Sequence, residues 1–226
     1  MSKRILCQYC QRPNKACICA FITPINNTIP VVILQHPSEI AQVKGTVALL
    51  ARSLQSCQVI IGENFSENEV LQQLLAQYQG LLLYPGAKAQ ELSGSLLESL
   101  RFRPLVGVNR NKQSSKKIKP YCLFVIDGTW KKAYKIFMLC EKLQQLKQIS
   151  LPVSLANSGR YTIRKVAKKN ALSSLEACCY GLSLLENSHK FQALLAKFDD
   201  FNQFQLSFRP KQQLTHYPAH SLGKSS

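Results

Sequence analysis

Acidic residues are scarce in this chain. Among 226 residues, 12 are Asp or Glu and 29 are Lys or Arg, which gives a formal net charge of +17. A compact body with this excess projects a positive field that attracts polyanions. The alternative is a charge that serves only solubility. Of the two polyanionic partners, nucleic acid and an anionic membrane surface, we favour nucleic acid because the sequence lacks the features of a membrane protein.

Long apolar runs are absent. No segment reaches the roughly 18 consecutive apolar residues that a membrane-spanning helix needs. The start, MSKRILCQYC, carries basic residues but lacks the apolar core of a signal peptide. The pattern G-x4-G-K-[ST] is also absent, which argues against a phosphate-loop enzyme. We therefore expect a cytoplasmic protein without membrane contact, and no obligate protein partner is evident.

Cysteine is concentrated at the start of the chain. Four of the nine cysteines are Cys7, Cys10, Cys17 and Cys19. An odd total excludes complete disulfide pairing, and cytosolic thiols are expected to stay reduced. The spacing C-x2-C-x6-C-x-C supplies four thiolates, the number that a closed, structural zinc site requires. We predict structural zinc at these four residues; the alternatives are an iron–sulfur cluster and unligated thiols.

Short apolar segments alternate with amphipathic ones along the rest of the chain. Helices are expected at residues 43–54, after a capping box of Ser66 and Glu69, and at 92–100, 130–146, 173–186 and 191–205. Strands are expected at 31–35, 58–61, 80–84, 121–126 and 148–153. This alternation predicts an α/β fold whose mainly parallel sheet is covered by helices on both faces. The expected organisation is a small zinc knuckle at 1–24, a catalytic domain at 25–210 and a disordered tail at 211–226.

Two segments rich in turn and polar residues follow predicted strands at their carboxyl ends, where ligands bind in open α/β sheets. They are Tyr84-Pro85-Gly86 and Asp127-Gly128-Thr129-Trp130. In a purely structural role, Asp127 or Thr129 would cap the next helix and Trp130 would pack in the core. In a functional role, Asp127 would place a carboxylate at the mouth of a pocket, and Trp130 would offer a ring on which a base can stack.

Two further segments also allow a structural and a functional interpretation. His36 and Glu39 follow the first predicted strand, where His36 can be merely structural and Glu39 can be a charge at a helix start. Ser173 and Glu176 have the spacing of a capping box and could at the same time line a site.

Basic residues gather in two places. The loop 158–170 combines arginine and lysine with an aromatic side chain, a composition that fits RNA better than a merely solvated surface. On the helix after Trp130, two lysines lie four residues apart and so share a face, which could contact phosphate or could simply be solvated. The predicted RNA-binding residues are Arg160, Tyr161, Arg164, Lys165, Lys131 and Lys135.

Six segments, taken in order, resemble one protein family. They are Cys7-x2-Cys10-x2-Pro13-x3-Cys17-x-Cys19, Leu34-Gln-His-Pro-Ser-Glu39, Leu83-Tyr-Pro-Gly86, Asp127-Gly-Thr-Trp130, Tyr161-Thr-Ile-Arg-Lys165 and Leu172-Ser-Ser-Leu-Glu-Ala177. Together they resemble the DTW-domain proteins, the tRNA-uridine aminocarboxypropyltransferases, of the bacterial type. Two departures are Ser174, where the family usually has threonine, and Lys44-Gly45-Thr46, where it often has an Asn-Thr pair.

The resemblance implies a fold and a reaction. The fold would be related to the SPOUT class, in which a deep trefoil knot holds S-adenosylmethionine (SAM). The reaction would transfer the 3-amino-3-carboxypropyl group of SAM to N3 of a tRNA uridine and release methylthioadenosine. For a bacterial member, the expected target is uridine 47 in the variable loop. The expected cofactors are therefore SAM as co-substrate and structural zinc, and the expected partner is tRNA.

The resemblance also implies roles for individual residues. Asp127 would take the N3 proton or hold the SAM amino group, Trp130 would stack on the uracil, and Arg164 would hold the SAM carboxylate or a tRNA phosphate. The expected catalytic residues are Asp127, Thr129 and Trp130. The expected cofactor-binding residues are Tyr84, Pro85, Gly86, Asp127, Ser173, Ser174 and Glu176.

Three other functions compete with this one. The first is a SAM-dependent RNA methyltransferase of related fold, which would add a methyl group in place of the larger group. The second is an aminocarboxypropyltransferase that acts on ribosomal RNA. The third is a non-catalytic, zinc-containing RNA-binding protein, which would explain the charge and the cysteines but not the polar segments at the strand ends.

Overall fold

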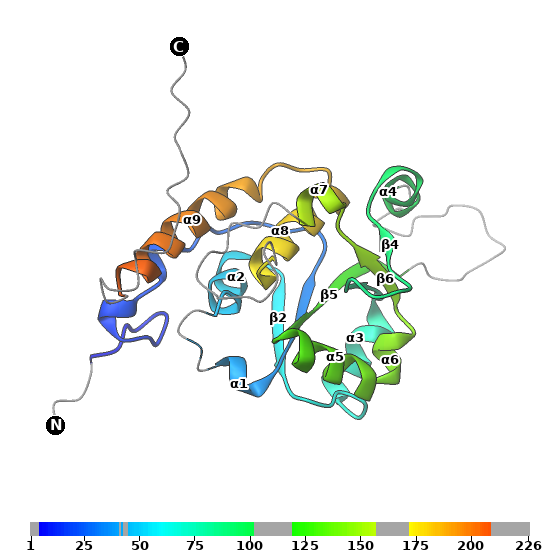
Figure 1. Cartoon of the computed structure of the whole chain (residues 1–226), viewed down its shortest axis with the longest axis horizontal. Helices are drawn as coiled ribbons and strands as arrows, with labels where there is room; N and C mark the ends of the chain where they lie inside the picture. Colours follow the sequence, from blue (N-terminus) through cyan, green and yellow to red (C-terminus); the bar gives the residue numbers. More distant parts are fainter. Residues whose placement is uncertain (1–4, 41, 43–44, 102–118, 157–171, 209–226) are drawn as a thin grey trace, which may run out of the picture.

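The computed structural model describes residues 5–40, 42, 45–101, 119–156 and 172–208 (Figure 1). Its strands are β1 (Val31–Gln35), β2 (Cys57–Ile61), β3 (Gln79–Leu83), β4 (Gln90–Glu91), β5 (Tyr121–Asp127) and β6 (Lys147–Ser150). Its α-helices are α1 (Pro37–Ile40), α2 (Val47–Ser53), α3 (Glu69–Gln77), α4 (Gly94–Arg101), α5 (Trp130–Leu139), α6 (Glu141–Gln144), α7 (Val153–Ala156), α8 (Ser174–Leu185) and α9 (Gln192–Ser207). Two short 3-10 helices, η1 (Asn14–Ala16) and η2 (Cys19–Phe21), lie near the start.

The six strands form one sheet in the order β2-β1-β5-β3-β6-β4, and every pairing in it is parallel. The prediction of an α/β fold with a mainly parallel sheet is confirmed. The central strands β1 and β5 are buried over almost their full length. Their sequences are almost entirely apolar because helices cover both faces of a parallel sheet, so the side chains on both faces are buried.

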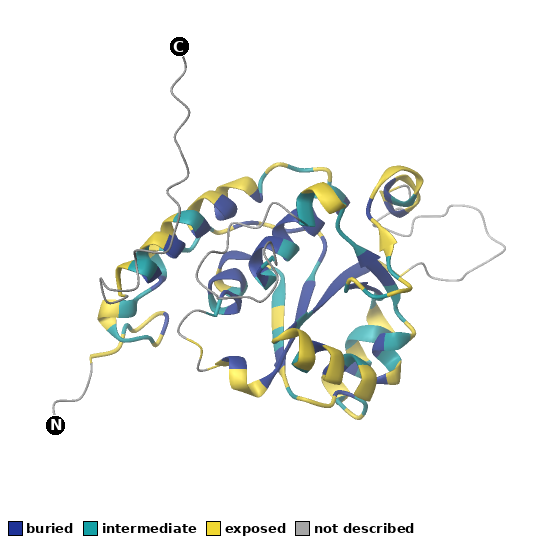
Figure 2. Cartoon of the chain, in the orientation of Figure 1, coloured by how far each residue is buried: buried dark blue, intermediate teal, exposed yellow. Residues whose placement is uncertain are grey.

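Alternate side chains of each central strand enter different cores. Ile33 lies in the core between the sheet and the helices α2, α8 and α9, whereas Leu34 lies in the core between the sheet and α3, α5 and α6. Figure 1 shows these two groups of helices on either side of the strands. Figure 2 shows their inner sides as buried and their outer sides as exposed. Helices therefore cover both faces of the sheet, as predicted.

Two details of the predicted helices are wrong. The capping box of Ser66 and Glu69 does not form: the N-cap of α3 is Asn68, whose side chain accepts from the backbone N–H of Leu71 at 2.8 Å. Ser66 instead donates its hydroxyl to the carbonyl of Leu139 at 2.7 Å. The helix predicted at 130–146 is two helices, because Cys140 has an extended backbone and a fully buried side chain between α5 and α6.

The connections that leave β1 and β5, which are adjacent, run toward opposite edges of the sheet. From β1 the chain continues to β2 on one side, and from β5 it continues to β6 on the other side. In open α/β sheets, a crevice opens beyond the carboxyl ends of two adjacent strands whose connections diverge in this way. Here those ends are Gln35 and Asp127, which are paired in register.

The cysteine-rich start packs against the last helix. Ile18 is buried in the same core as the inner sides of α2 and α8. The ring of Phe21 contacts the rings of Phe201 and Phe204 on α9, with centroids 5.7 Å and 5.2 Å apart. Helix η2 and the last helix, α9, therefore lie side by side (Figure 1). Within the described ranges, no helix has the length and apolar character needed to cross a membrane.

Candidate active site at the carboxyl ends of β1 and β5

Asp127 lies at the carboxyl end of β5, where the strand order predicts a ligand site. Its side chain is 9% exposed at the last position of β5. Carboxylate oxygen Oδ2 accepts a hydrogen bond from Nε2 of Gln35 at 3.0 Å, and Oδ1 accepts one from the hydroxyl of Ser174 at 2.5 Å. These two donors fix the orientation of the carboxylate. Each oxygen keeps lone-pair capacity for a further donor from a ligand.

The amino ends of two helices adjoin Asp127. Helix α5 begins three residues later, and α8 begins with Ser174, which contacts Asp127 directly. The free N–H groups at helix amino ends attract anionic groups of ligands. The site therefore combines one carboxylate, which suits a cationic group or a proton, with two helix ends that suit a carboxylate or a phosphate.

The two residues that were considered for structural roles after Asp127 differ: Thr129 caps a helix, whereas Trp130 is exposed and does not pack in the core. The N-cap of α5 is Thr129, whose hydroxyl accepts from the backbone N–H of Lys132 at 3.4 Å. The structural role considered for Thr129 therefore applies. Trp130 is 54% exposed, so it is not a core residue and its ring is accessible to a ligand.

His36 and its neighbours form a network of polar contacts beside Asp127. The backbone N–H of His36 donates to the carbonyl of Asp127 at 3.0 Å. The backbone N–H of Ser38 donates to Nδ1 of His36 at 3.2 Å, so Nδ1 is the acceptor nitrogen. The other ring nitrogen, Nε2, lies 3.3 Å from a carboxylate oxygen of Glu63. His36 thus links the carboxyl ends of β1, β2 and β5.

Two ion pairs connect α5 to this network. Lys135 binds Glu63 at 2.7 Å, and its hydrogen bond and its charge lower the pKa of that carboxyl group below its usual value. Lys132 binds the buried carboxylate of Glu39 at 3.1 Å. Glu39 is therefore more than a charge at a helix start, since it ties α1 to α5.

The segment Tyr84-Pro85-Gly86 follows β3, one strand away from β5. The ring of Tyr84 stacks on Phe137 of α5, with centroids 4.7 Å apart and planes at 18°. Pro85 is exposed. A β-carbon added at Gly86 would lie 2.8 Å from the side-chain oxygen of Gln148, so a larger residue would require the Gln148 side chain to move. No contact between this segment and Asp127 is described, and its role in binding SAM stays a prediction.

The predicted capping box of α8 is present. The hydroxyl of Ser173 accepts from the backbone N–H of Glu176 at 3.2 Å, and the Glu176 carboxylate accepts from the backbone N–H of Ser173 at 2.8 Å. Glu176 is completely buried. These contacts position Ser174 beside Asp127, whereas a direct contact of Ser173 or Glu176 with a cofactor stays a prediction.

The predicted RNA-binding residues are only partly described. Lys131 and Lys135 are exposed on α5, but Lys135 already binds Glu63. The other four predicted residues lie outside the described ranges: Arg160, Tyr161, Arg164 and Lys165.

The four amino-terminal cysteines converge as predicted. Their sulfur atoms all lie within 4.8 Å of one another, with Cys7 and Cys19 at 3.7 Å and Cys10 and Cys17 at 3.8 Å. Four sulfurs about 2.3 Å from a central zinc in a tetrahedron are separated by about 3.8 Å. The cluster therefore fits a zinc ion. Backbone N–H groups of Cys10 and Tyr9 lower the pKa of Cys7 to about 6, whereas burial and the neighbouring thiols raise the pKa of Cys19 to about 12, so Cys7 ionises most readily of these two.

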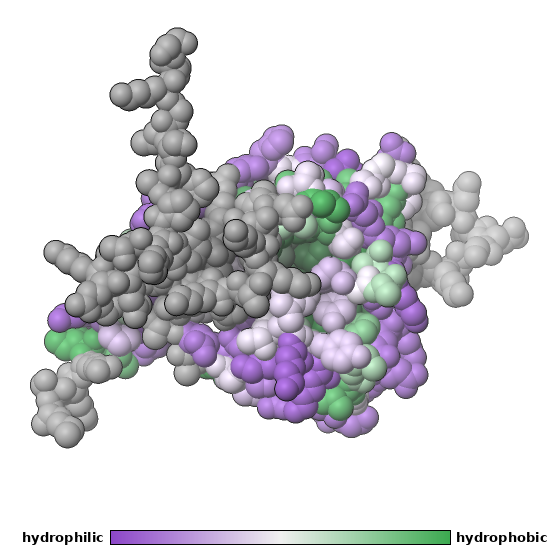
Figure 3. All heavy atoms as spheres, in the orientation of Figure 1, coloured by the Kyte–Doolittle hydropathy of each residue, from purple (hydrophilic) through white to green (hydrophobic). Residues whose placement is uncertain are grey.

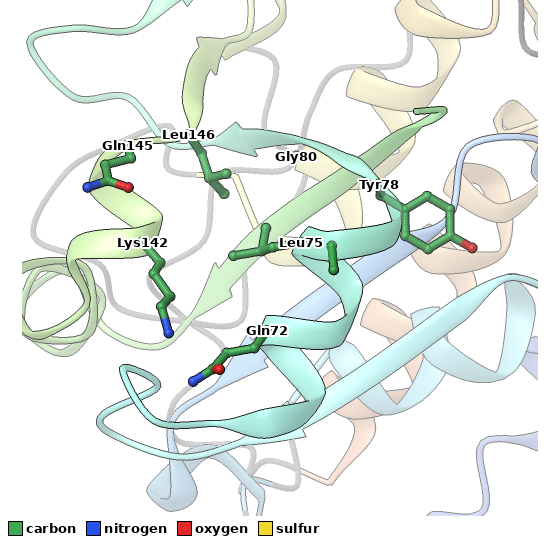
Figure 4. A pocket seen from close by; sticks show the side chains of 8 residues that line it. Gln72, Leu75, Tyr78, Gly80, Lys142, Gln145 and Leu146 are labelled. Atoms are coloured by element: carbon green, nitrogen blue, oxygen red, sulfur yellow. The ribbon is translucent and has the colours of Figure 1, made fainter. Parts of the chain in front are cut away.

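A pocket of about 520 Å³ lies away from this site (Figure 4). It opens at the amino ends of β3 and β6. Its lining residues are Gln72, Leu75, Ala76, Tyr78, Gly80, Lys142, Gln145 and Leu146. The side chains of Gln72 and Lys142 extend beside it, and Nζ of Lys142 donates to the carbonyl of Ser66 at 2.9 Å. Because ligands of parallel sheets bind at the carboxyl ends, we assign the chemistry to the region of Asp127 and not to this pocket.

Sequence reasoning missed Gln35, Glu63 and Lys132. Gln35 carried a signal, because it is the one polar residue at the end of an otherwise apolar buried strand, next to His36. Glu63 and Lys132 carried none, since their partners are 72 and 93 residues away in sequence.

A model of the DTW domain matches residues 4–206. The chain is similar to tRNA-uridine aminocarboxypropyltransferase 2 of Macaca fascicularis, with 34% identity over 201 residues that cover 86% of this chain and 61% of the relative. For the Mus musculus protein of the same name, the identity is 33% with the same coverage. For that of Drosophila melanogaster it is 30% over 203 residues, 87% of this chain and 72% of the relative.

The chain spans about three fifths of the length of the first two relatives. No solved structure matches it. The family match covers nearly all of the chain and includes both the Asp127 segment and the cysteine cluster. The resemblance seen in the sequence is thereby confirmed, and the chain belongs to the DTW domain family.

Proposed function

We propose that this chain is a tRNA-uridine aminocarboxypropyltransferase that uses SAM as donor. The observation that carries the proposal is the carboxylate of Asp127, fixed by Gln35 and Ser174 where β1 and β5 diverge. Membership of the DTW domain family and the names of the three relatives support it. The net charge of +17 suits a polyanionic substrate such as tRNA.

The reaction forms one bond and breaks one. SAM supplies an electrophilic γ-carbon on its methionine part and methylthioadenosine as the leaving group. N3 of the uridine bonds to that carbon while the carbon–sulfur bond breaks, and the N3 proton is lost. Selectivity for this carbon over the methyl carbon depends on in-line positioning of the two substrates.

Asp127 has two candidate tasks in this reaction. As a general base, its carboxylate takes the N3 proton while the new bond forms. As a ligand, it binds the amino group of SAM, while the amino end of α5 or α8 attracts the SAM carboxylate. Trp130 stacks on the uracil in either case, because its exposed ring begins the helix that follows Asp127.

The finer points of the proposal concern topology and target. The parallel sheet with β5 between β1 and β3 is compatible with a SPOUT-like fold and a trefoil knot. Residues 157–171, which precede α8, lie outside the described ranges. The bacterial type, uridine 47 as target, a cytoplasmic location and the boundaries 1–24, 25–210 and 211–226 are proposals of the same kind.

Zinc completes the proposal. Cys7, Cys10, Cys17 and Cys19 would hold it as a structural ion, because four thiolates leave no open position for a substrate. Its contribution would be to the stability of the amino-terminal segment, which packs against α9 through Phe21.

The test is to incubate the purified chain with SAM and an unmodified tRNA transcript and to analyse the nucleosides by mass spectrometry. We expect a uridine heavier by one aminocarboxypropyl group. A methylated nucleoside would show that the chain is a methyltransferase instead. No modified nucleoside, together with no binding of SAM in calorimetry, would support the non-catalytic RNA-binding protein.

A further inference from the structure

Helix α5 exposes three large apolar side chains in a row. Trp130, Tyr134 and Met138 are 54%, 57% and 50% exposed. They lie four residues apart, so they follow one another along one side of the helix. Ile136, on the opposite side, is buried, and so is Ala133, which borders the row on the inner side. Figure 2 shows the outward side of α5 as exposed. We call Trp130, Tyr134 and Met138 the α5 stripe.

Lysines border the α5 stripe. Lys131 and Lys135 precede Tyr134 and Met138 by three residues, so they form a second row beside the stripe. Both are exposed, and Lys135 binds Glu63. Figure 3 shows hydrophobic and hydrophilic spheres side by side over this part of the molecule. Aromatic rings, here those of Trp130 and Tyr134, beside a row of cations are the arrangement by which proteins bind single-stranded nucleic acid.

The stripe starts at the candidate active site. Trp130 is the third residue after Asp127. Tyr134, one turn further, lies close enough to Tyr84 to help raise the pKa of that phenol, after the larger effect of burial. Tyr84 in turn follows β3 and stacks on Phe137. A strand of RNA whose target base lies at Asp127 would therefore reach Trp130 first and Tyr134 next.

Two occupants could cover such a face, an RNA strand or a second copy of this chain. Charge favours RNA: two copies would each bring a net charge of +17, whereas an RNA strand neutralises the adjacent lysines. Spacing also favours it. Successive rings are about 6 Å apart along the helix axis, more than the roughly 3.4 Å between stacked bases. The rings thus suit splayed bases of an unpaired loop, the usual target of sequence-specific RNA recognition.

We propose that the α5 stripe is a stacking platform for unpaired nucleotides next to the target uridine, with Tyr134 binding the base that neighbours it and Met138 extending the apolar surface. The inference rests on the proposed function, because it takes tRNA as the substrate. It adds a specificity-determining residue, Tyr134, outside the segments that carry the family resemblance.

The test uses the fact that Trp130 is the only tryptophan. Its fluorescence reports stacking of a base at the start of the stripe, without any need for catalysis. We would titrate wild-type protein and Tyr134→Ala with an unmodified tRNA transcript and follow this fluorescence. Loss of one stacked base weakens single-stranded RNA binding about tenfold. We expect this increase in the Kd of tRNA, with an equal increase in the KM for tRNA and no change in the KM for SAM.

Two further variants separate stacking from other effects. Tyr134→Phe keeps the ring and is expected to restore most of the affinity. Val70→Ala, on α3, removes an exposed apolar side chain elsewhere and is expected to bind tRNA as wild type does. Circular dichroism checks that Tyr134→Ala is folded, which we expect because the side chain is more than half exposed.

The outcomes distinguish this inference from the proposed function. If Tyr134→Ala binds tRNA within twofold of wild type, the stacking platform is wrong even if uridine is modified. If wild-type protein binds tRNA but modifies no uridine, the proposed function is wrong, and a tenfold loss in Tyr134→Ala still supports the platform. If light scattering shows a wild-type dimer that Tyr134→Ala converts to a monomer, the stripe is a subunit interface and the inference is overturned.

Discussion

Ser174 donates its hydroxyl to Oδ1 of Asp127 at 2.5 Å, although the two residues lie 47 positions apart in sequence. This hydrogen bond joins the amino end of α8 to the carboxyl end of β5. Gln35 holds the second oxygen of the same carboxylate. The orientation of the Asp127 carboxylate therefore depends on a strand and a helix that only the folded chain brings together. Ser174→Ala, Ser174→Thr and Asp127→Asn test whether transfer needs this orientation.

Removing the hydroxyl of Ser174 should impair transfer without unfolding the protein. In Ser174→Ala, Asp127 loses one of its two orienting donors, and we expect kcat for uridine modification to fall about tenfold, the cost of one hydrogen bond to a charged group. Ser174→Thr keeps the hydroxyl and should retain most activity. Single-turnover assays with tRNA and SAM measure both. Equal activity of Ser174→Ala and wild type would show that the hydrogen bond does not position the carboxylate for transfer.

Asp127→Asn should abolish most of the activity. The amide has the size of the carboxylate but cannot accept a proton or pair with a cation, and loss of a general base lowers rates by about 100-fold or more. Asp200→Asn on α9 is the matched control, because Asp200 is exposed, pairs with Lys197 and should leave transfer unchanged. If SAM still binds Asp127→Asn with wild-type Kd, the base role is favoured over the ligand role. Full activity of Asp127→Asn with an unchanged melting temperature would exclude both roles.

Most of the sheet follows from the sequence because its signals are local. The five long strands appear within three residues of their predicted ends, since unbroken apolar runs such as 31–34 and 121–126 have no stable place outside a buried parallel sheet. The two-residue strand β4 and the one-turn helices α1 and α7 were not predicted, because segments this short have no periodicity to detect.

The site was predicted in its residue types but not in its contacts. Asp127 and Ser174 were singled out separately, and nothing in the sequence paired them. No glycine or proline marks the helix break at Cys140 in the sequence, because the break comes from burial of the Cys140 side chain in the core. The N-cap of α3 differs from the prediction for a similar reason. Ser66 matched the capping-box pattern, but its hydroxyl donates to the carbonyl of Leu139, and Asn68 caps the helix instead.

The capping box of α8 should contribute to stability independently of catalysis. Ser173→Ala removes the hydroxyl that accepts from the backbone N–H of Glu176, and we expect the free energy of unfolding to fall by about 1 kcal/mol. Urea denaturation measures it. Ser99→Ala is the matched control, since Ser99 is exposed within α4 and its loss should change stability by less than about 0.5 kcal/mol. Equal effects of the two variants would show that the capping box contributes nothing.

The cysteine cluster should bind one zinc ion per chain. Inductively coupled plasma mass spectrometry of the purified protein is expected to give one equivalent of zinc per chain, and the Cys17→Ser variant should contain no zinc. Cys57→Ala should keep its zinc, because burial raises the pKa of Cys57 to about 12 and that thiol lies outside the cluster.

Thiol reactivity provides the second half of the zinc test. At pH 8, the thiols of Cys57 and Cys122 stay protonated and unreactive, since burial raises the pKa of each to about 12. A chelator should therefore expose the four thiols of the cluster, with Cys7, whose pKa is about 6, reacting first. Fast reaction of all four before chelation, with no zinc detected, would contradict the metal site.

The most direct test of the central claim is the fate of two labels in SAM. One preparation carries carbon-13 in the methyl group and the other in the carboxyl group, and each is incubated with the chain and unmodified tRNA. We predict that the carboxyl label enters a uridine nucleoside while the methyl label leaves in methylthioadenosine. Transfer of the methyl label to the nucleoside, with the carboxyl label retained in S-adenosylhomocysteine, would contradict the account and identify a methyltransferase.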